Sequence, residues 1–150
     1  MNNESLIKGR IAEYIVELLL EENGYKVVRI GQDGLLSPVI RKDTKKLNKA
    51  DSAGKITTAP SYAVFDSKGT SVVLTKIKFK SEKSKGGNIA HGLGQLQKYW
   101  PEAKLVVVSS KAPYFLIFQT SKEEPIEVIF TQIKKQSLKD FERVVKKFFK

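Results

Sequence analysis

The chain has 150 residues, of which 41% are hydrophobic, so it has the length and composition of one folded, soluble domain. It contains no cysteine and one histidine, which excludes disulfides, zinc fingers and thiol catalysis and argues against histidine-rich metal sites. The 27 Lys and Arg against 16 Asp and Glu give a formal net charge of +11. A polyanion is the expected partner, because each neutralised phosphate releases condensed counterions.

Other interpretations of this charge are a lysine-rich surface kept for solubility, an anionic membrane surface and an acidic protein. No apolar run approaches the ~18 residues that a membrane helix needs, and the N-terminus has no pattern of a secretory signal. We therefore expect a cytoplasmic protein that binds nucleic acid and no membrane. The sequence leaves homodimer formation and the choice between DNA and RNA open.

The first predicted element is a helix over residues 4–23, ended by Asn23-Gly24, which tolerate the left-handed conformation of a helix end. Apolar residues form two stripes on opposite sides of this helix and so cover much of its circumference. Glu13 interrupts the second of these stripes. A carboxylate at such a position has either a buried partner or a function. A strand over residues 25–30 follows.

Residues 31–60 have the weakest pattern and predict a long, basic and partly mobile loop. The next two strands, 62–65 and 71–80, form a hairpin through the turn Asp66-Ser67-Lys68-Gly69. Alternation along the second strand directs Val73, Thr75, Ile77 and Phe79 to one face and Lys76, Lys78 and Lys80 to the other.

A connector rich in Gly and Lys over residues 81–87 leads to a helix at 88–99. Residues 105–109 predict a strand buried on both faces, and residues 114–119 and 126–130 predict two more strands. The last helix is expected to open at Ser137-x-x-Asp140, with an apolar face of Phe141, Val144, Val145, Phe148 and Phe149. Together these elements predict a single α/β domain in which helices flank a mixed sheet.

Four pieces of the chain, in this order, resemble the PD-(D/E)XK nuclease superfamily. Gly9-x-x-x-Glu13, followed by Asn23-Gly24-Tyr25, is similar to the opening of archaeal Holliday-junction resolvases. Pro60-Ser61 stands where the family has Pro-Asp, and Lys76-Ile77-Lys78 stands where it has (Asp/Glu)-x-Lys. Gln95-x-x-x-Tyr99 is similar to a helix motif of exonuclease-helicase nuclease domains. The resemblance implies a restriction-endonuclease-like fold. It also predicts that Ser61, Lys76 and Lys78 lie together near Glu13 at one edge of the sheet.

In that family the acidic residues hold a divalent metal and the lysine orients or activates the attacking water. Here Ser61 and Lys76 replace both motif acids, while Lys78 and Glu13 are retained and Gln95 and Tyr99 are accessory residues. Hard cations need anionic oxygen ligands, and an ammonium ~6 Å from a divalent ion at an effective dielectric of ~20 repels it by roughly 5 kcal/mol. The resemblance therefore implies DNA binding with phosphodiester cleavage lost or severely weakened and no bound cofactor, although residual cleavage would need Mg²⁺ or Mn²⁺.

Each of these residues also has a simpler interpretation. Glu13 could be a paired acid, Ser61 a strand-entry residue, Asp66 a turn residue, and the alternate lysines a guard against edge pairing. Two other functions compete with DNA binding: an active nuclease with an unusual ligand set, such as Glu13, Asp66 and main-chain carbonyls, and a protein-interaction module. The lysines expected to contact phosphate, without sequence specificity because lysine acts as a point charge, are Lys42, Lys45, Lys46, Lys49, Lys80, Lys83 and Lys85.

Overall fold

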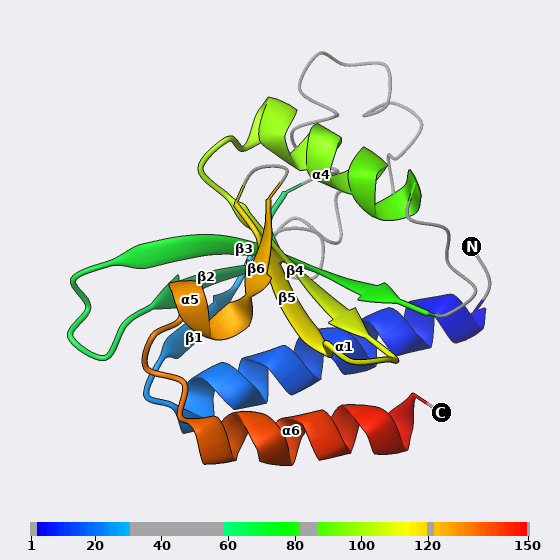
Figure 1. The fold of residues 1–150 in the computed structure, drawn as a ribbon. Helices are drawn as coiled ribbons and strands as arrows, with labels where there is room; N and C mark the ends of the chain where they lie inside the picture. Colours follow the sequence, from blue (N-terminus) through cyan, green and yellow to red (C-terminus); the bar gives the residue numbers. More distant parts are fainter. Residues whose placement is uncertain (1–2, 31–58, 82–86, 120–121, 150) are drawn as a thin grey trace.

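The computed structural model describes residues 3–30, 59–81, 87–119 and 122–149. In these residues six strands form one mixed sheet with helices on both faces (Figure 1), which confirms the predicted α/β class. The helices are α1 (Asn3–Glu22), α4 (Gly87–Tyr99), α5 (Ile126–Ile129) and α6 (Lys135–Phe148). The strands are β1 (Lys26–Arg29), β2 (Tyr62–Phe65), β3 (Val72–Lys80), β4 (Lys104–Ser109), β5 (Phe115–Phe118) and β6 (Glu123–Pro125).

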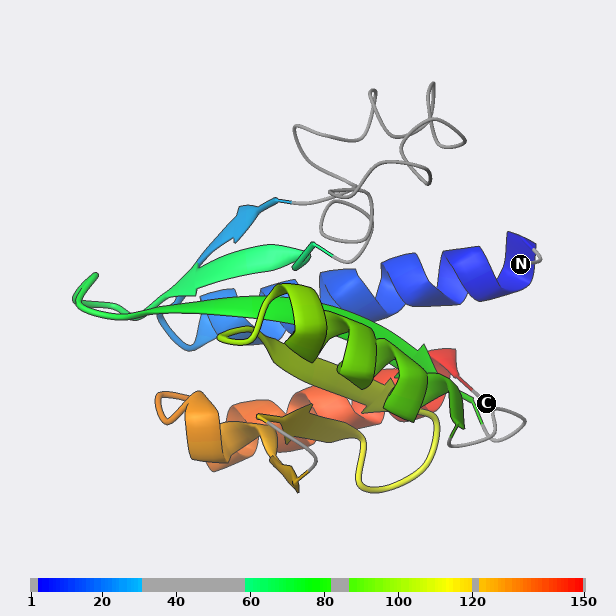
Figure 2. The ribbon, with the colours of Figure 1, turned by 90° about the horizontal axis from the view of Figure 1, so that it is seen from above.

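The strands lie in the sheet in their chain order. β3 and β4 are parallel, and every other neighbouring pair is antiparallel. Parallel neighbours need a crossover connection, and α4 lies between β3 and β4 in the chain. Seen from above, α4 lies across these two strands (Figure 2), so it covers the part of the sheet that it connects.

The two faces of the sheet have different covers. Ile77 of β3 belongs to the larger apolar core, together with the buried residues of α1 and with Val145 of α6. Leu74 of β3 packs instead into a smaller core with Leu93 and Leu96 of α4. Figure 1 shows this arrangement, with α1 and α6 on one side of the sheet and α4 on the other. The β4 residues 105–108 are buried between both cores, as their continuous apolar run predicts.

α1 ends where its sequence predicts. Gly24 has a φ of +90°, in the left-handed region that a glycine adopts without strain, and its N–H donates to the carbonyl of Glu21. The buried positions of α1 come only from its second half and middle: Ala12, Ile15, Val16, Leu19 and Leu20. Its first two turns extend past the core, since Leu6 and Ile7 are 49% and 57% exposed.

The strand predicted at residues 126–130 is wrong, because this segment forms the short helix α5. Ile126 and Phe130 are buried, whereas Val128 is 50% exposed. A strand ending on the sheet would have directed all three side chains to the same face. Burial of residues four apart, after Pro125 at the N-cap, is instead the pattern of a helical turn. The final strand is the shorter segment Glu123–Pro125.

The predicted opening of the last helix at Ser137 is also wrong. α6 begins at Lys135, and its N-cap residue Lys134 makes no side-chain capping bond. Ser137 is buried and donates to the carboxylate of Glu22 at the end of α1. Most of the predicted apolar face packs on the main core, but Phe148 is 60% exposed and lies outside it. In the described part of the chain, no helix is long and apolar enough to cross a bilayer.

Candidate nucleic-acid interface

Three lysines leave the same face of β3, the face that α4 partly covers. In the parallel register, Lys76, Lys78 and Lys80 pair with Leu105, Val107 and Ser109 of β4. Leu105 and Val107 are buried beneath α4, whereas the three lysines are only half-buried. We call Lys76, Lys78 and Lys80 the basic β3 face. Their alternation with buried Thr75 and Ile77 confirms the predicted strand pattern.

Lys78 lies against α4. Its side chain lies against Gly92 of α4, so that a Cβ atom added to Gly92 would lie 2.8 Å from Cε of Lys78. Burial lowers the pKa of the Lys78 ammonium below its usual value of 10.5. In the described part of the chain this ammonium has no ion-pair or hydrogen-bond partner. Lys78 is therefore a partly desolvated cation without a counter-ion in residues 3–30, 59–81, 87–119 and 122–149.

Ser61 and Lys76 lie beside Lys78, as the resemblance implies. The N–H of Ser61 donates to the carbonyl of Thr75 at 2.8 Å, and its Oγ accepts a bond from the N–H of Ile77 at 3.4 Å. The ammonium of Lys76 donates to the carbonyl of Ala59 at 3.2 Å, among other interactions. These contacts place Ser61 beside the segment of β3 that contains Lys76 and Lys78.

Glu13 does not join them, and this expectation is wrong. Its helix, α1, packs on the sheet face that contains Tyr62 and Ile77, and the Tyr62 hydroxyl donates to the main-chain carbonyl of Glu13 at 3.3 Å. Lys78 leaves β3 on the opposite face and lies on α4. Successive side chains of a strand alternate between faces, so a helix that covers Ile77 lies on the wrong side of the sheet to meet Lys78.

Glu17, one helical turn after Glu13 in α1, has a structural role. Glu17 binds Arg29 of β1 at 3.0 Å, and the Arg29 guanidinium lies 5.9 Å from the centroid of the Tyr62 ring. The hydrogen bond that Arg29 donates to the Glu17 carboxylate is the main reason that the pKa of Arg29 is raised. This cluster holds the edge strand β1 against α1.

The ligand set of the alternative nuclease is not assembled among the described residues. Both carboxylate oxygens of Asp66 are occupied in the hairpin turn, where they accept bonds from Thr70 and Ser71. The interpretation of Asp66 as a turn residue is confirmed, and Gly69 of the same turn has a φ of +67°. Within the described ranges no three His, Asp or Glu side chains are grouped so that they could hold a metal ion.

Gln95 and Tyr99 lie on α4 at three and seven positions after Gly92. This spacing places them on one stripe of the helix with Gly92, the residue that Lys78 contacts. Both side chains are half-buried, and the Lys98 ammonium lies 5.1 Å from the centroid of the Tyr99 ring. His91 is exposed. The Gln-x-x-x-Tyr motif therefore lies on the same stripe of α4 as the glycine that Lys78 contacts.

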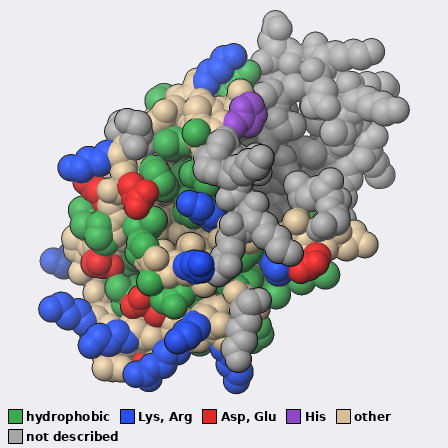
Figure 3. Space-filling view, turned by 45° about the vertical axis from the view of Figure 1, so that its right-hand side comes forward, with side chains coloured by type: hydrophobic (Ala, Val, Ile, Leu, Met, Phe, Trp, Pro, Cys, Tyr) green, Lys and Arg blue, Asp and Glu red, His purple; other side chains and the backbone are tan. Residues whose placement is uncertain are grey.

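A second basic surface lies on α6, and the sequence interpretation missed it. On the face drawn in Figure 3, Lys and Arg side chains line the lower margin, where α6 lies in Figure 1. Spacings of three and four place most of these residues on one helix stripe, a signal that was available in the sequence. The exposed basic residues of α6 are Lys135, Lys139, Arg143, Lys146 and Lys147.

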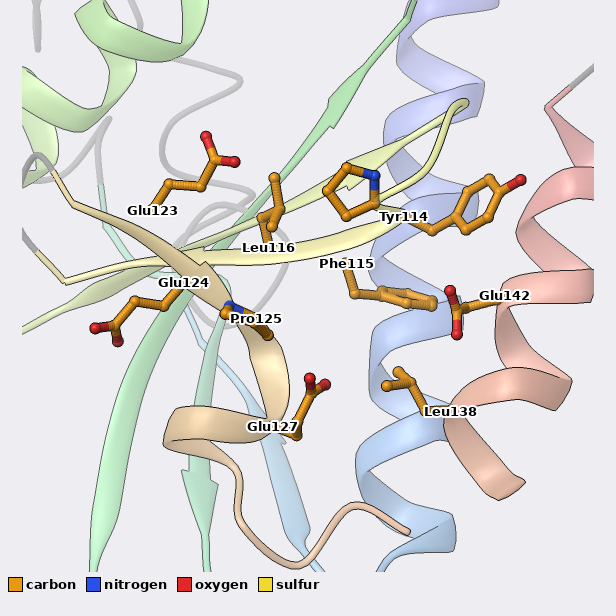
Figure 4. A pocket seen from close by; sticks show the side chains of 10 residues that line it. Tyr114, Phe115, Leu116, Glu123, Glu124, Pro125, Glu127, Leu138 and Glu142 are labelled. Atoms are coloured by element: carbon orange, nitrogen blue, oxygen red, sulfur yellow. The ribbon is translucent and has the colours of Figure 1, made fainter. Parts of the chain in front are cut away.

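The region around β5, β6, α5 and α6 has the opposite charge. A hollow of about 440 Å³ there is lined by Glu123, Glu124, Glu127 and Glu142, together with Tyr114, Phe115 and other apolar residues. Figure 4 shows Glu127 and Glu142 approaching it from α5 and α6, while Glu123 and Glu124 project from β6. Glu124 is held by Gln119 and Lys122. Four carboxylates make this region unsuitable for a phosphate backbone.

Of the lysines expected to contact phosphate, Lys80 is the one that falls in the described residues. The remainder, Lys42, Lys45, Lys46, Lys49, Lys83 and Lys85, lie outside them. Comparison of the chain with models of known families, with curated proteins and with solved structures gives no match.

Proposed function

We propose that this protein binds the DNA backbone without base specificity, with the basic β3 face beside α4 as a contact surface. The observation that carries the proposal is the ammonium of Lys78, which is partly buried and has no counter-ion among the residues that the structure describes. Removing a cation from water is unfavourable unless an anion compensates for it. A phosphate oxygen of a bound backbone would supply that compensation at a position where Lys76 and Lys80 add further positive charge.

The composition supports the same partner. A net charge of +11 favours the binding of a polyanion to the protein. Lysines contact phosphate as point charges and carry little information about bases. The one aromatic residue of β3, Phe79, packs against the main core on the face opposite to the lysines, so a platform for stacking single-stranded bases is not favoured. Duplex or junction DNA is the better candidate.

We propose further that phosphodiester cleavage is lost or severely weakened. The order of elements, a helix followed by three antiparallel strands, a crossover helix and a parallel strand, supports the resemblance to PD-(D/E)XK nucleases. The catalytic acids do not agree, because Ser61 and Lys76 stand at their positions and Glu13 comes from the other side of the sheet. A protein that keeps the binding surface and not the metal ligands would bind DNA without cutting it.

Two double variants with the same change of charge test the location of the surface. Lys78→Ala with Lys80→Ala removes two positive charges from the basic β3 face, and Lys146→Ala with Lys147→Ala removes two from α6. Binding of a labelled duplex is followed by fluorescence anisotropy over a range of salt concentrations. Wild type is expected to give a slope of about −5 in log K against log salt, as for five or six phosphate contacts.

The β3 pair is expected to reduce the slope by about 2 and the α6 pair by less, because each phosphate contact contributes about 0.9 to the slope. Equal losses in both pairs would mean that net charge acts without a site. A larger loss in the α6 pair would move the surface to α6. No binding by wild type at low salt, or a flat response to salt, would remove nucleic acid as the partner and favour the protein-interaction module.

A further inference from the structure

The contact between Lys78 and Gly92 depends on the absence of a side chain on α4. A Cβ atom at Gly92 would lie 2.8 Å from Cε and 3.4 Å from Cδ of Lys78, and closer still to Nζ. Separations under about 3 Å are too short for carbon atoms that are not bonded. Any residue other than glycine at this position therefore displaces the end of the lysine side chain.

Gly94, two residues further along the same helix, has no such contact. A Cβ atom added there would meet nothing within 4 Å. Glycine inside a helix costs about 0.5–1 kcal/mol relative to alanine, and neither Gly92 nor Gly94 has a positive φ that would require it. The space beside Gly92 is therefore occupied by the end of the Lys78 side chain, whereas the space beside Gly94 is open.

We propose that Gly92 is a positioning residue, which holds the Lys78 ammonium against α4 so that it meets one phosphate of the bound DNA in a fixed geometry. This inference rests on the proposed function and adds to it a residue that touches no DNA. Lys76 and Lys80 are the charged groups on either side of Lys78 on β3, and on α4 the nearest charged or titratable neighbours in the chain are His91 and Lys98. No carboxylate of β3 or α4 competes with the phosphate, because neither element contains Asp or Glu.

The displacement should leave the fold intact. The atoms that meet the added Cβ are the last three of a flexible side chain, which can swing into solvent. The backbone of α4 gains helix propensity when glycine becomes alanine. Gly92→Ala is thus expected to move one ammonium and little else, and Gly94→Ala is its matched control.

The first measurement concerns Lys78 alone and needs no DNA. The ammonium of Lys78 is titrated by NMR of its Nζ and Cε nuclei, with Lys78→Arg used to assign the signals. In wild type and in Gly94→Ala the pKa of Lys78 is expected below 10.5, and in Gly92→Ala it is expected to return toward 10.5 because the displaced amine regains water. An unchanged pKa in a folded Gly92→Ala variant would overturn the positioning role, whatever the protein binds.

The second measurement is duplex binding by the same variants. Gly92→Ala is expected to weaken binding about tenfold, the range for one hydrogen bond to a charged group, and to reduce the salt slope by about 1. Gly94→Ala should match wild type. In a Lys78→Ala background, Gly92→Ala should have no further effect, since the group that it displaces is gone.

The outcomes separate the two levels of the proposal. If wild type binds no DNA but Gly92→Ala changes the pKa of Lys78, Gly92 positions the lysine and the proposed DNA function fails. If wild type binds DNA and Gly92→Ala changes the pKa without changing the affinity, the phosphate does not meet Lys78 and the inference is overturned. A Gly92→Ala variant that weakens binding equally in the Lys78→Ala background would act through the structure of α4 and would also overturn it.

Discussion

The side-chain amide of Asn23, at the end of α1, donates a hydrogen bond of 2.9 Å to the hydroxyl of Ser137 in α6, 114 positions later in the chain. The same amide nitrogen donates to the carbonyl of Leu19 at 2.8 Å, and its oxygen accepts a bond from the N–H of Lys134 at 2.9 Å. Asn23 thus follows the last residue of α1 and accepts the hydrogen bond of Lys134, the N-cap residue of α6. Since Asn23 and Ser137 are both buried, this network fixes how the two helices meet.

Asn23→Leu is expected to lower the free energy of unfolding by about 2–4 kcal/mol. The variant leaves the N–H of Lys134 without its acceptor and removes a donor from Ser137, and each unsatisfied buried group costs about 1–3 kcal/mol. The control is Gln136→Leu, at an exposed position whose side chain makes one bond, to Asp140, with an expected change within about 0.5 kcal/mol. Chemical denaturation measures both, and an equal effect of the two variants would contradict the role of the network.

Asp66→Asn is expected to change how the stability of the fold depends on pH. Hydrogen bonds, first from the Thr70 hydroxyl, lower the pKa of Asp66 below its usual 3.8. A lowered carboxyl pKa stabilises the fold above the unfolded value of 3.8, and this stabilisation is lost as the pH falls through the folded pKa. The gap in melting temperature between wild type and variant should be full at neutral pH and should close below about pH 4. Glu21→Gln, at an exposed acid of α1, should run parallel to wild type, and a gap for Asp66→Asn that does not vary with pH would reject this explanation.

Lys78→Met is expected to stabilise the protein and to weaken DNA binding. Burial lowers the pKa of Lys78, so the charged amine destabilises the fold below that pKa, and the destabilisation disappears above 10.5. The gain at neutral pH should be at most about 1 kcal/mol, because solvent still reaches the side chain, and should shrink as the pH approaches 10.5. Thermal denaturation at neutral and high pH, with Lys80→Met for comparison, measures the gain. A loss of stability at neutral pH would show that the ammonium is well solvated or has a partner.

Much of the fold follows from local patterns in the sequence. The alternation of β3, the apolar run of β4 and the Asn23-Gly24 helix end are properties of a few adjacent residues, and all three have the predicted form. α5 was mistaken for a strand because an apolar segment as short as Ile126–Phe130 fits either period, and only its place after β6 decides between them. Ser137 was mistaken for a cap because its partners, Asn23 and Glu22, are distant in sequence.

The candidate site, like the fold, was predictable where it depends on residues close in the sequence. Cross-strand neighbours such as Ser61 and Lys76 follow from the hairpin, and the lysine face follows from alternation. Which helix covers which face is a property of the whole fold, and for that reason Glu13 was expected on the wrong side. The contact of Lys78 with Gly92 also needed the structure, since a helix glycine alone gives no indication of what lies opposite it.

The last prediction concerns positions 61 and 76, where the resemblance implies metal-binding acids. Ser61→Asp with Lys76→Glu introduces two acids beside Lys78, and an aspartate at position 61 could still accept the bond from the N–H of Ile77. The double variant is expected to bind Mn²⁺ in a calorimetric titration, while each single variant binds much less, because one carboxylate still lacks its partner. Ser61→Asn with Lys76→Gln, of similar shape without the negative charge, should bind none.

Metal binding by the double variant is not expected to bring cleavage with it. Glu13 lies on the other side of the sheet from Lys78, so the introduced pair lacks the third carboxylate that the resemblance implies. The measurement is nicking of a supercoiled plasmid in Mg²⁺ or Mn²⁺ by wild type, the double variant and Glu13→Ala. If the double variant cleaves the plasmid and the addition of Glu13→Ala to it abolishes cleavage, Glu13 reaches the site. Robust Mg²⁺-dependent cleavage by wild type, lost in Glu13→Ala, would replace the binding protein with an active nuclease of unusual ligand set.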